Sequence, residues 1–188
     1  MAILLDDAAR GELGAAIERL RPVARDVAWV VPGNLHLTLK FLGGVDEDRI
    51  GELTAAIAGA ASGVAAFAAG LRGLGAFPSL TRPRVIWAGF REGAEVMAAL
   101  ADRVDAALAS LGFTREARPF SAHITLGRVR QPGRNPGLSD ALRTAEGYQF
   151  GRIGVARVTL MRSELSPRGV RYSELASVRL GEDAGHGI

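Results

Sequence analysis

Two matching tetrapeptides constrain the fold of this chain more than any other feature of its sequence. His36-Leu37-Thr38-Leu39 and His123-Ile124-Thr125-Leu126 both read His, apolar, Thr, apolar. In a β-strand, residues i and i+2 point to the same face of the sheet. Each tetrapeptide therefore predicts a strand that presents an imidazole and a hydroxyl side by side and turns its aliphatic side chains into a core. Because the two motifs sit in comparable places along the chain, we expect two related lobes with a cleft between them.

The pattern around the tetrapeptides predicts an α+β fold. Strands and amphipathic helices are mixed along the chain, and several strands are joined by hairpin-length links. This favours antiparallel sheets over a doubly wound parallel sheet. We expect one bilobal domain over residues 1–180 and a disordered tail over residues 181–188. The expected strands cover 3–5, 27–31, 35–42, 64–74, 84–90, 121–128, 149–154, 155–165 and 170–180, and the expected helices run from Asp6 or Asp7 to Leu20, from Asp46 through Ile57, over 94–111 and over 139–145.

The composition argues against several other kinds of protein. The chain has 188 residues, 48% of them hydrophobic, and no cysteine. A disulfide framework, a thiolate nucleophile and a cysteine zinc site are therefore excluded, and a reducing, cytoplasmic location is expected. The chain does not begin with a basic and then apolar segment, so no secretory signal is predicted. Residues 53–71 carry no charge, but they are mostly Ala and Gly, so we expect a helix end, a turn at Ser62-Gly63 and a buried strand rather than a membrane span.

The charge of the chain is unevenly distributed. Residues 1–114 carry 11 basic and 13 acidic side chains, whereas residues 115–179 carry 12 basic and 5 acidic, a net charge of +7. All the basic residues except Lys40 are arginines, whose guanidinium groups fork well onto phosphate oxygens. A coding bias toward arginine explains the ratio of Arg to Lys but not the asymmetry. The second tetrapeptide lies in the positive part, which favours a polyanionic ligand.

The paired motifs supply groups suited to chemistry at a phosphate. An imidazole titrates near pH ~6.5, so one histidine can accept a proton from an attacking water while another donates one to a leaving oxygen. Thr38 and Thr125 can donate hydrogen bonds to non-bridging phosphate oxygens. Neither a metal nor another cofactor is expected, because the chain shows no carboxylate cluster or third histidine at ligand spacing and no phosphate-binding glycine loop. One His-x-Thr alone occurs by chance in many proteins; two in the same context favour a site.

Together with their flanks, these residues make the chain resemble the two-histidine (2H) phosphoesterases, and within them the RNA 2′,3′-cyclic phosphodiesterases, also called 2′-5′ RNA ligases. The resemblance spans most of the chain, in order. It rests on Trp29–Gly44 (WVVPGNLHLTLKFLGG), Phe77–Gly89 (FPSLTRPRVIWAG), Ala122–Val129 (AHITLGRV) and Leu160–Leu175 (LMRSELSPRGVRYSEL).

The resemblance implies a pseudo-symmetric bilobal fold, in which each lobe is an antiparallel sheet backed by helices and the motif strands face each other across a central groove. It implies hydrolysis of RNA that ends in a 2′,3′-cyclic phosphate to a 2′-phosphomonoester. His36 corresponds to the proton donor and His123 to the proton acceptor, and Thr38 and Thr125 hold the phosphate. Arg128 is a further phosphate contact if a bulge near Gly127 turns it toward the groove; otherwise it is a solvent-facing strand-end arginine.

The residues leave several alternatives. The substrate is an RNA or oligonucleotide with a cyclic phosphate end, an ADP-ribose cyclic phosphate, a 2′-5′ oligonucleotide or the partners of reversible 2′-5′ ligation; or the chain is an RNA-end-binding module with little turnover. A monomer without an obligate protein partner is expected. Lys40 either adds charge near the phosphate or is solvated. Four aromatic residues either stack a base or belong to the core, and residues 163–172 either line the groove or form a hairpin. The four aromatic residues are Phe41, Phe77, Trp87 and Phe120.

Overall fold

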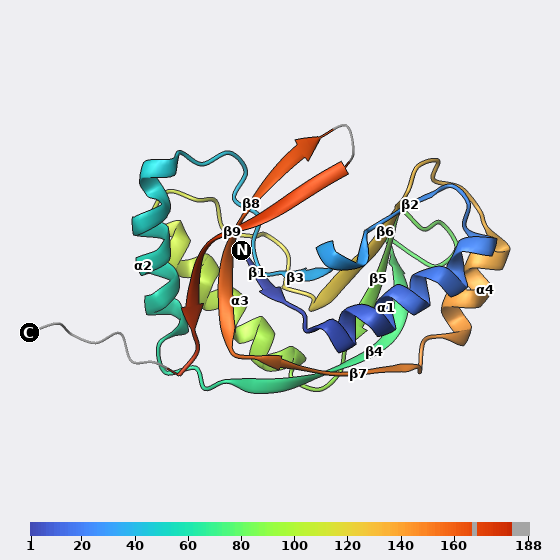
Figure 1. The fold of residues 1–188 in the computed structure, drawn as a ribbon, viewed down its shortest axis with the longest axis horizontal. Helices are drawn as coiled ribbons and strands as arrows, with labels where there is room; N and C mark the ends of the chain where they lie inside the picture. Colours follow the sequence, from blue (N-terminus) through green and yellow to red (C-terminus); the bar gives the residue numbers. More distant parts are fainter. Residues whose placement is uncertain (167–168, 182–188) are drawn as a thin grey trace, which may run out of the picture.

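Nine strands form one curled antiparallel sheet within residues 1–166 and 169–181, the part of the chain that the computed structural model describes (Figure 1). The strands are β1 (Ala2–Leu4), β2 (Val27–Trp29), β3 (His36–Thr38), β4 (Phe67–Phe77), β5 (Val85–Phe90), β6 (His123–Val129), β7 (Gln149–Val155), β8 (Arg157–Ser166) and β9 (Gly169–Arg179). Their order across the sheet is β7-β4-β5-β6-β3-β1-β8-β9, and β2 pairs with β6 beside this path.

Helices cover the two halves of the sheet as separate pairs (Figure 1). In one half α2 (Ile50–Ala61) and α3 (Ala94–Ala109) pack together, and α2 also contacts β8 and β9. In the other half α1 (Asp7–Leu20) packs against β7 and α4 (Pro136–Thr144) against β4. Single 3₁₀ turns precede β2, β3 and α2 at η1 (Arg21–Val23), η2 (Pro32–Asn34) and η3 (Glu47–Arg49). The predicted α+β antiparallel class is confirmed.

The two halves of the sheet meet at the motif strands. Outward from the centre, one half runs β6, β5, β4, β7 and the other β3, β1, β8, β9. Leu37 of β3 pairs with Ile124 of β6, and both side chains are fully buried. The structure therefore joins the two predicted lobes into one continuous sheet. The motif strands are hydrogen-bonded neighbours rather than opposite walls of a groove, because their aliphatic side chains enter one common core.

The predicted elements are all present, but the first motif strand is much shorter than residues 35–42. After Thr38, the backbone N–H groups of Leu39 and Lys40 both turn to the carbonyl oxygen of Met1, at 2.9 and 3.4 Å. The side chain of Lys40 enters the interior, where the residue is only 4% exposed. Alternation therefore stops at Thr38, although the sequence alternates for three more residues.

The uncharged stretch 53–71 is divided between two elements. Helix α2 ends at Ala61 and β4 begins at Phe67, as a helix end followed by a strand predicts. Across residues 1–166 and 169–181, no helix is long and apolar enough to cross a membrane. The predicted tail lies outside the described residues from 182 onward, as do residues 167–168 of the predicted β8–β9 turn.

Candidate active site

The histidine and threonine side chains of the two motifs lie on one face of the sheet at the junction of its halves. The antiparallel pairing of Leu37 with Ile124 places His36 across from Thr125 and Thr38 across from His123. The two histidines therefore occupy diagonal corners of a four-residue group, with the threonines at the other two corners. Leu37 and Ile124 point to the opposite face and into the core. This is the alternation that the sequence predicts.

Each imidazole is oriented by a hydrogen bond to the backbone two residues before it. His36 Nδ1 donates to the carbonyl oxygen of Asn34 at 2.8 Å, and His123 Nδ1 donates to the carbonyl oxygen of Ser121 at 2.7 Å. A carbonyl oxygen can only accept, so Nδ1 carries the hydrogen in both rings. In each ring Nε2 is then the atom left to accept or release a proton. Asn34 and Ser121 act through their backbones, so the only sequence signal for them is their common position relative to each histidine.

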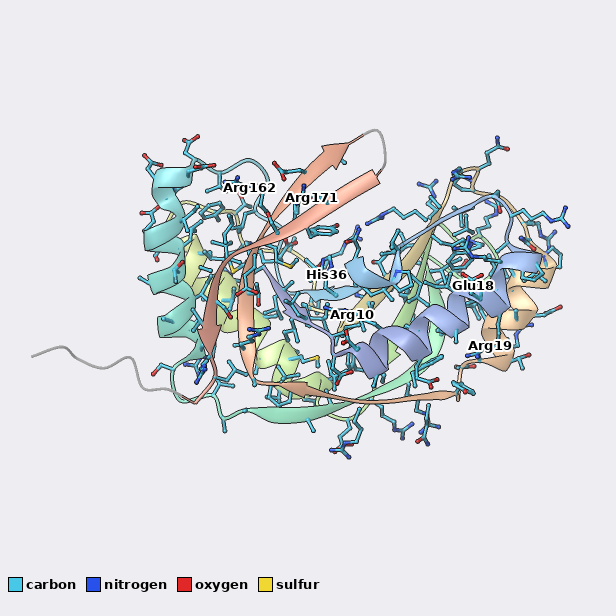
Figure 2. All side chains as sticks on the ribbon, viewed as in Figure 1. Arg10, Glu18, Arg19, His36, Arg162 and Arg171 are labelled. Carbon is cyan, nitrogen blue, oxygen red and sulfur yellow. The ribbon has the colours of Figure 1, made fainter. Side chains whose placement is uncertain are left out.

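An aromatic ring stands edge-on to each histidine. The ring centroids of Tyr172 and His36 are 4.8 Å apart at an interplanar angle of 72°, and those of Phe77 and His123 are 5.1 Å apart at 84°. Phe77 also packs against Trp87, with centroids 5.3 Å apart. Figure 2 shows His36 beneath the β8–β9 hairpin that carries Tyr172, with Arg162 and Arg171 on its two strands. The two histidines thus have similar surroundings, each with one aromatic ring edge-on to the imidazole.

Burial changes the acidity of His36. Loss of solvent lowers the pKa of His36 below its usual value of about 6.5, and the hydrogen bond to Asn34 only partly opposes this change. The positive charge of the N-terminal amino group lowers the pKa of His36 further. In the protein without a bound anion, the neutral form of His36 is therefore favoured at neutral pH.

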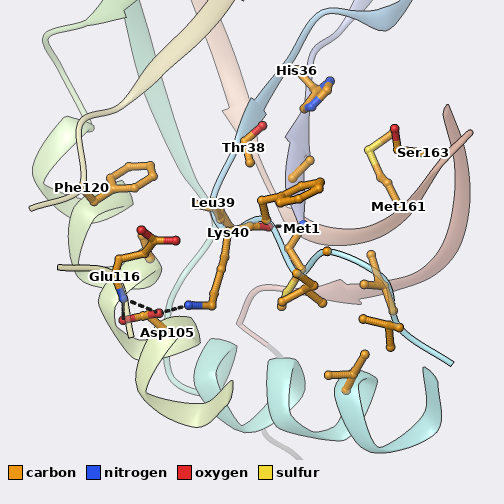
Figure 3. Close-up of a pocket in the computed structure, with 18 of the residues that line it drawn as sticks. Met1, His36, Thr38, Leu39, Lys40, Asp105, Glu116, Phe120, Met161 and Ser163 are labelled. Atoms are coloured by element: carbon orange, nitrogen blue, oxygen red, sulfur yellow. Dashed lines mark hydrogen bonds and ion pairs between the residues drawn. The ribbon is translucent and has the colours of Figure 1, made fainter. Parts of the chain in front are cut away.

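All five residues that the sequence places in the site line one cavity of about 1380 Å³. These residues are His36, Thr38, His123, Thr125 and Arg128. Figure 3 shows His36 and Thr38 in the middle of the view, with Phe120 on one side and Met161 and Ser163 on the other. A cavity of this size holds at least a nucleotide-sized molecule.

A β-bulge brings Arg128 into this cavity. Ile86 pairs with Gly127 but Trp87 pairs with Thr125, so Leu126 is an additional residue in β6. Such an insertion reverses the alternation beyond it. Arg128, which strict alternation would turn away from His123, therefore lines the same cavity as that histidine. The bulge is at the position where the sequence required one.

For some of the aromatic residues and for residues 163–172, the sequence allowed two interpretations, and the structure shows where they lie. Phe41 and Phe120 line the cavity, and Phe41 is 75% exposed. Ser163 and Tyr172 also line it, but Arg171 is not among the described lining residues. Arg168 lies outside the described part of the chain. Strands β8 and β9 pair along their length, so the segment both forms a hairpin and borders the cavity.

The interpretation of Lys40 as a solvated side chain is wrong, because the residue is only 4% exposed. Its Nζ donates to a carboxylate oxygen of Asp105 and, at 2.7 Å, to the carbonyl oxygen of Thr114 (Figure 3). Arg115 Nε lies 3.0 Å from the other carboxylate oxygen. Burial by itself would raise the pKa of Asp105, but hydrogen bonds from Lys40 and Glu116 N–H, with the charges of Lys40 and Arg115, lower it overall. The charge of Lys40 is paired with that of Asp105, and Lys40 also lines the cavity that holds the two histidines.

Comparison with known proteins places this geometry in a family. Residues 3–87 and 91–172 match the model described as LigT like Phosphoesterase. An RNA 2′,3′-cyclic phosphodiesterase of Methanothermobacter thermautotrophicus is 32% identical over 96% of this chain and 97% of its own length. One of Archaeoglobus fulgidus is 35% identical over 93% and 96%.

Solved structures agree with the fold. A crystal structure of a Thermus thermophilus protein covers 95% of each chain at 33% identity, with a TM-score of 0.79. The crystal structure of E. coli LigT complexed with 3′-AMP covers 96% of each chain at 26% identity, with a TM-score of 0.75. The predicted resemblance is confirmed, and the chain belongs to the LigT-like phosphoesterase family.

Proposed function

We propose that this protein hydrolyses the 2′,3′-cyclic phosphate at the end of an RNA to a 2′-phosphomonoester, with His36 and His123 making the two proton transfers. The observation that carries the proposal is their matched arrangement. Both rings line one cavity, and both are held through Nδ1 by a backbone carbonyl, which reserves Nε2 for chemistry. The full-length similarity to proteins named RNA 2′,3′-cyclic phosphodiesterase supports this substrate class.

The diagonal placement of the histidines suits an in-line displacement. One imidazole takes a proton from water as the water oxygen forms a bond to phosphorus. The other imidazole gives a proton to the 3′-oxygen as the bond between that oxygen and phosphorus breaks, which leaves the phosphate on the 2′-oxygen. The attacking and leaving oxygens lie on opposite sides of the phosphorus, and the two histidines lie at opposite corners of the four-residue group.

The remaining groups are placed to stabilise the phosphate. Thr38 and Thr125 occupy the other two corners and can donate hydrogen bonds to the non-bridging oxygens. Arg128 adds a positive charge in the same cavity. Within the described residues, no three His, Asp or Glu side chains gather as metal ligands. The pair of histidines supplies both proton transfers, so we propose catalysis without a metal, and by a monomer, since one chain supplies every group.

We assign His36 as the donor and His123 as the acceptor. A donor must be protonated when the substrate is bound, yet burial lowers the pKa of His36 in the free protein. The anionic phosphate counters this, because a nearby negative charge favours the imidazolium form. The assignment therefore requires that substrate binding itself raise the pKa of His36.

The test is the product formed from a short RNA with a 2′,3′-cyclic phosphate end, in the presence of EDTA. Phosphorus NMR should show a 2′-phosphomonoester. The variants His36→Ala and His123→Ala should each lose about 10²–10⁴-fold in kcat, since each removes one proton-transfer group. Circular dichroism should show an unchanged fold. A 3′-phosphate product, dependence on a chelatable metal, or near wild-type rates in either variant would contradict the proposal.

A further inference from the structure

A second cavity, of about 840 Å³, is lined by four arginines and no acidic side chain among the described residues. Arg82 and Arg84 come from the link between β4 and β5, Arg118 from the link between α3 and β6, and Arg134 from the link between β6 and α4. Three loops far apart in the sequence thus place four positive charges around one hollow, where low-dielectric walls concentrate the field.

These four arginines differ from the arginines of the described chain that form ion pairs. Seven arginines lie within ion-pair distance of a carboxylate: Arg10, Arg21, Arg49, Arg115, Arg143, Arg152 and Arg162. Arg82, Arg84, Arg118 and Arg134 are exposed, and no described carboxylate pairs with any of them. Their donors are therefore available to an external anion.

The link that carries Arg82 and Arg84 is anchored to the sheet and to α4. Arg84 N–H donates to the carbonyl oxygen of Phe77 at 2.8 Å, and Val129 N–H donates to the carbonyl oxygen of Arg84 at 2.9 Å. Ser139 Oγ donates to the carbonyl oxygen of Leu80 at 2.6 Å. A cluster of like charges on anchored backbone cannot disperse freely, so it favours a ligand with several negative charges.

The second cavity continues the active-site cavity on the side of His123. Arg118 lines both cavities. Phe77 lines the second cavity, and its ring stands edge-on to His123. Val85, also in the second cavity, pairs across the sheet with Arg128 of the first. A chain whose end lies at the histidines can therefore extend along the four arginines.

We propose that the second cavity binds the phosphodiester backbone of the RNA upstream of its cyclic-phosphate end. This inference rests on the proposed function and concerns the length of the RNA substrate, which the proposed function does not specify. A nucleoside 2′,3′-cyclic phosphate has one phosphate, which the histidines hold. Only a longer RNA has further phosphates that reach the arginines, so the enzyme should prefer oligonucleotides to mononucleotides.

The experiment compares kcat/KM for cytidine 2′,3′-cyclic phosphate and for an oligoribonucleotide with the same 3′ end. The wild-type protein should have a kcat/KM about tenfold or more higher for the oligonucleotide. In the double variant Arg84→Gln/Arg134→Gln this ratio should fall by about tenfold, because KM for the oligonucleotide rises. The dependence of log(kcat/KM) on log[salt] for the oligonucleotide should become shallower by about 0.7 for each phosphate that the variant no longer binds. The matched control is Arg103→Gln, an exposed arginine on α3 that should leave the preference unchanged.

The outcomes separate this inference from the function on which it rests. If the wild-type protein cleaves both substrates equally well, or if the double variant loses activity on both to the same extent, the second cavity does not bind upstream RNA. If the wild-type protein cleaves neither substrate, the proposed function fails. Fluorescence anisotropy with a labelled oligonucleotide then still decides the inference: binding about tenfold weaker in the double variant than in Arg103→Gln supports it, and equal binding overturns it.

Discussion

At the level of single residues, His36 and His123 have matching local sequences and the same kind of carbonyl contact, and burial lowers the pKa of His36 below its usual value. The ring of Tyr172 is one of the groups that shield His36 from water. The direction of the shift in pKa has a kinetic consequence. A histidine that must donate or accept a proton produces one limb of the pH profile of kcat/KM, at the pKa of that histidine in the free enzyme. The lowered pKa of His36 places its limb at lower pH.

The variant Tyr172→Ala should therefore move the limb that His36 produces to higher pH. Removing the ring admits water to His36, which reduces the desolvation and lets its pKa rise toward about 6.5. Tyr172→Phe is the matched control, because it keeps the ring and should leave the limb in place. The measurement is the pH profile of kcat/KM on a cyclic-phosphate oligonucleotide. An unchanged pH profile in Tyr172→Ala would mean that this ring does not lower the pKa of His36.

The alternation of the two tetrapeptides was sufficient to predict which side chains share the site face. His36 and Thr38 could be predicted because the face of a strand residue depends on its neighbours in sequence alone. Lys40 continues the same alternation, but its burial could not be predicted, because its partner Asp105 lies 65 positions away on α3. A carboxylate on an otherwise apolar helix face was the signal that a buried cation would be needed.

At the level of elements, the buried ion pair of Lys40 and Asp105 connects the segment that follows the first motif strand to α3. Lys40→Met should destabilise the protein by about 3–5 kcal/mol, since it leaves a buried carboxylate without its main partner. Urea denaturation measures the loss. The double variant Lys40→Met/Asp105→Leu should recover much of the stability, because no uncompensated charge remains. Equal stability of Lys40→Met and the wild-type protein would show that the pair does not hold these elements together.

Gly75 on β4 leaves room for the indole ring of Trp87, which is part of a chain of ring contacts that ends at His123. A Cβ at this position would lie 2.3 Å from Trp87 Cζ2, and Trp87 packs on Phe77, which contacts His123. Gly75→Ala should therefore shift the indole, cost about 1–3 kcal/mol of stability and lower kcat. The control is Gly59→Ala on the exposed face of α2, where a Cβ meets no atom within 4 Å and should stabilise the helix. Thermal unfolding and kcat test both variants, and an unchanged kcat in Gly75→Ala would count against this support of His123.

The elements themselves were largely predictable because their signals are local. Asp6 begins α1 by accepting a hydrogen bond from Ala9 N–H at 2.8 Å, as a capping residue ahead of an apolar stripe predicts. The sequence could show that Arg128 needs a bulge to reach the site, but it could not show that the bulge forms, since this depends on how β6 pairs with β5. The early end of β3 could not be predicted, because it depends on contacts with Met1 and α3.

At the level of the whole molecule, the halves share one core that passes beneath the motif strands. Buried side chains from both halves form a single cluster that includes Leu37 and Ile124. We therefore propose that residues 1–180 form one domain that unfolds in one cooperative transition. Calorimetry should give equal calorimetric and van't Hoff enthalpies, and near- and far-ultraviolet circular dichroism should coincide. Two separate transitions would mean that the halves are independent domains.

The arrangement of the halves was only partly accessible from the sequence. The repeated motif predicts two related halves, but the pairing of Leu37 with Ile124 joins residues 87 positions apart, and no local pattern encodes it. The grouping of the four arginines around the second cavity could not be predicted from local sequence either. The positive part of the chain supplies Arg118 and Arg134, whereas Arg82 and Arg84 come from the part with an acidic excess, and only the fold brings them together.

The central claim is that His36 and His123 have opposite roles in proton transfer, and the most direct test replaces the 3′-oxygen of the cyclic phosphate by sulfur. A thiolate leaves without being protonated, so the sulfur substrate needs no proton donor. We predict that His36→Ala, crippled by about 10²–10⁴-fold on the oxygen substrate, will approach wild-type kcat on the sulfur substrate, whereas His123→Ala will remain defective on both. Equal defects of both variants on both substrates would contradict the claim, and rescue of His123→Ala instead would reverse the two roles.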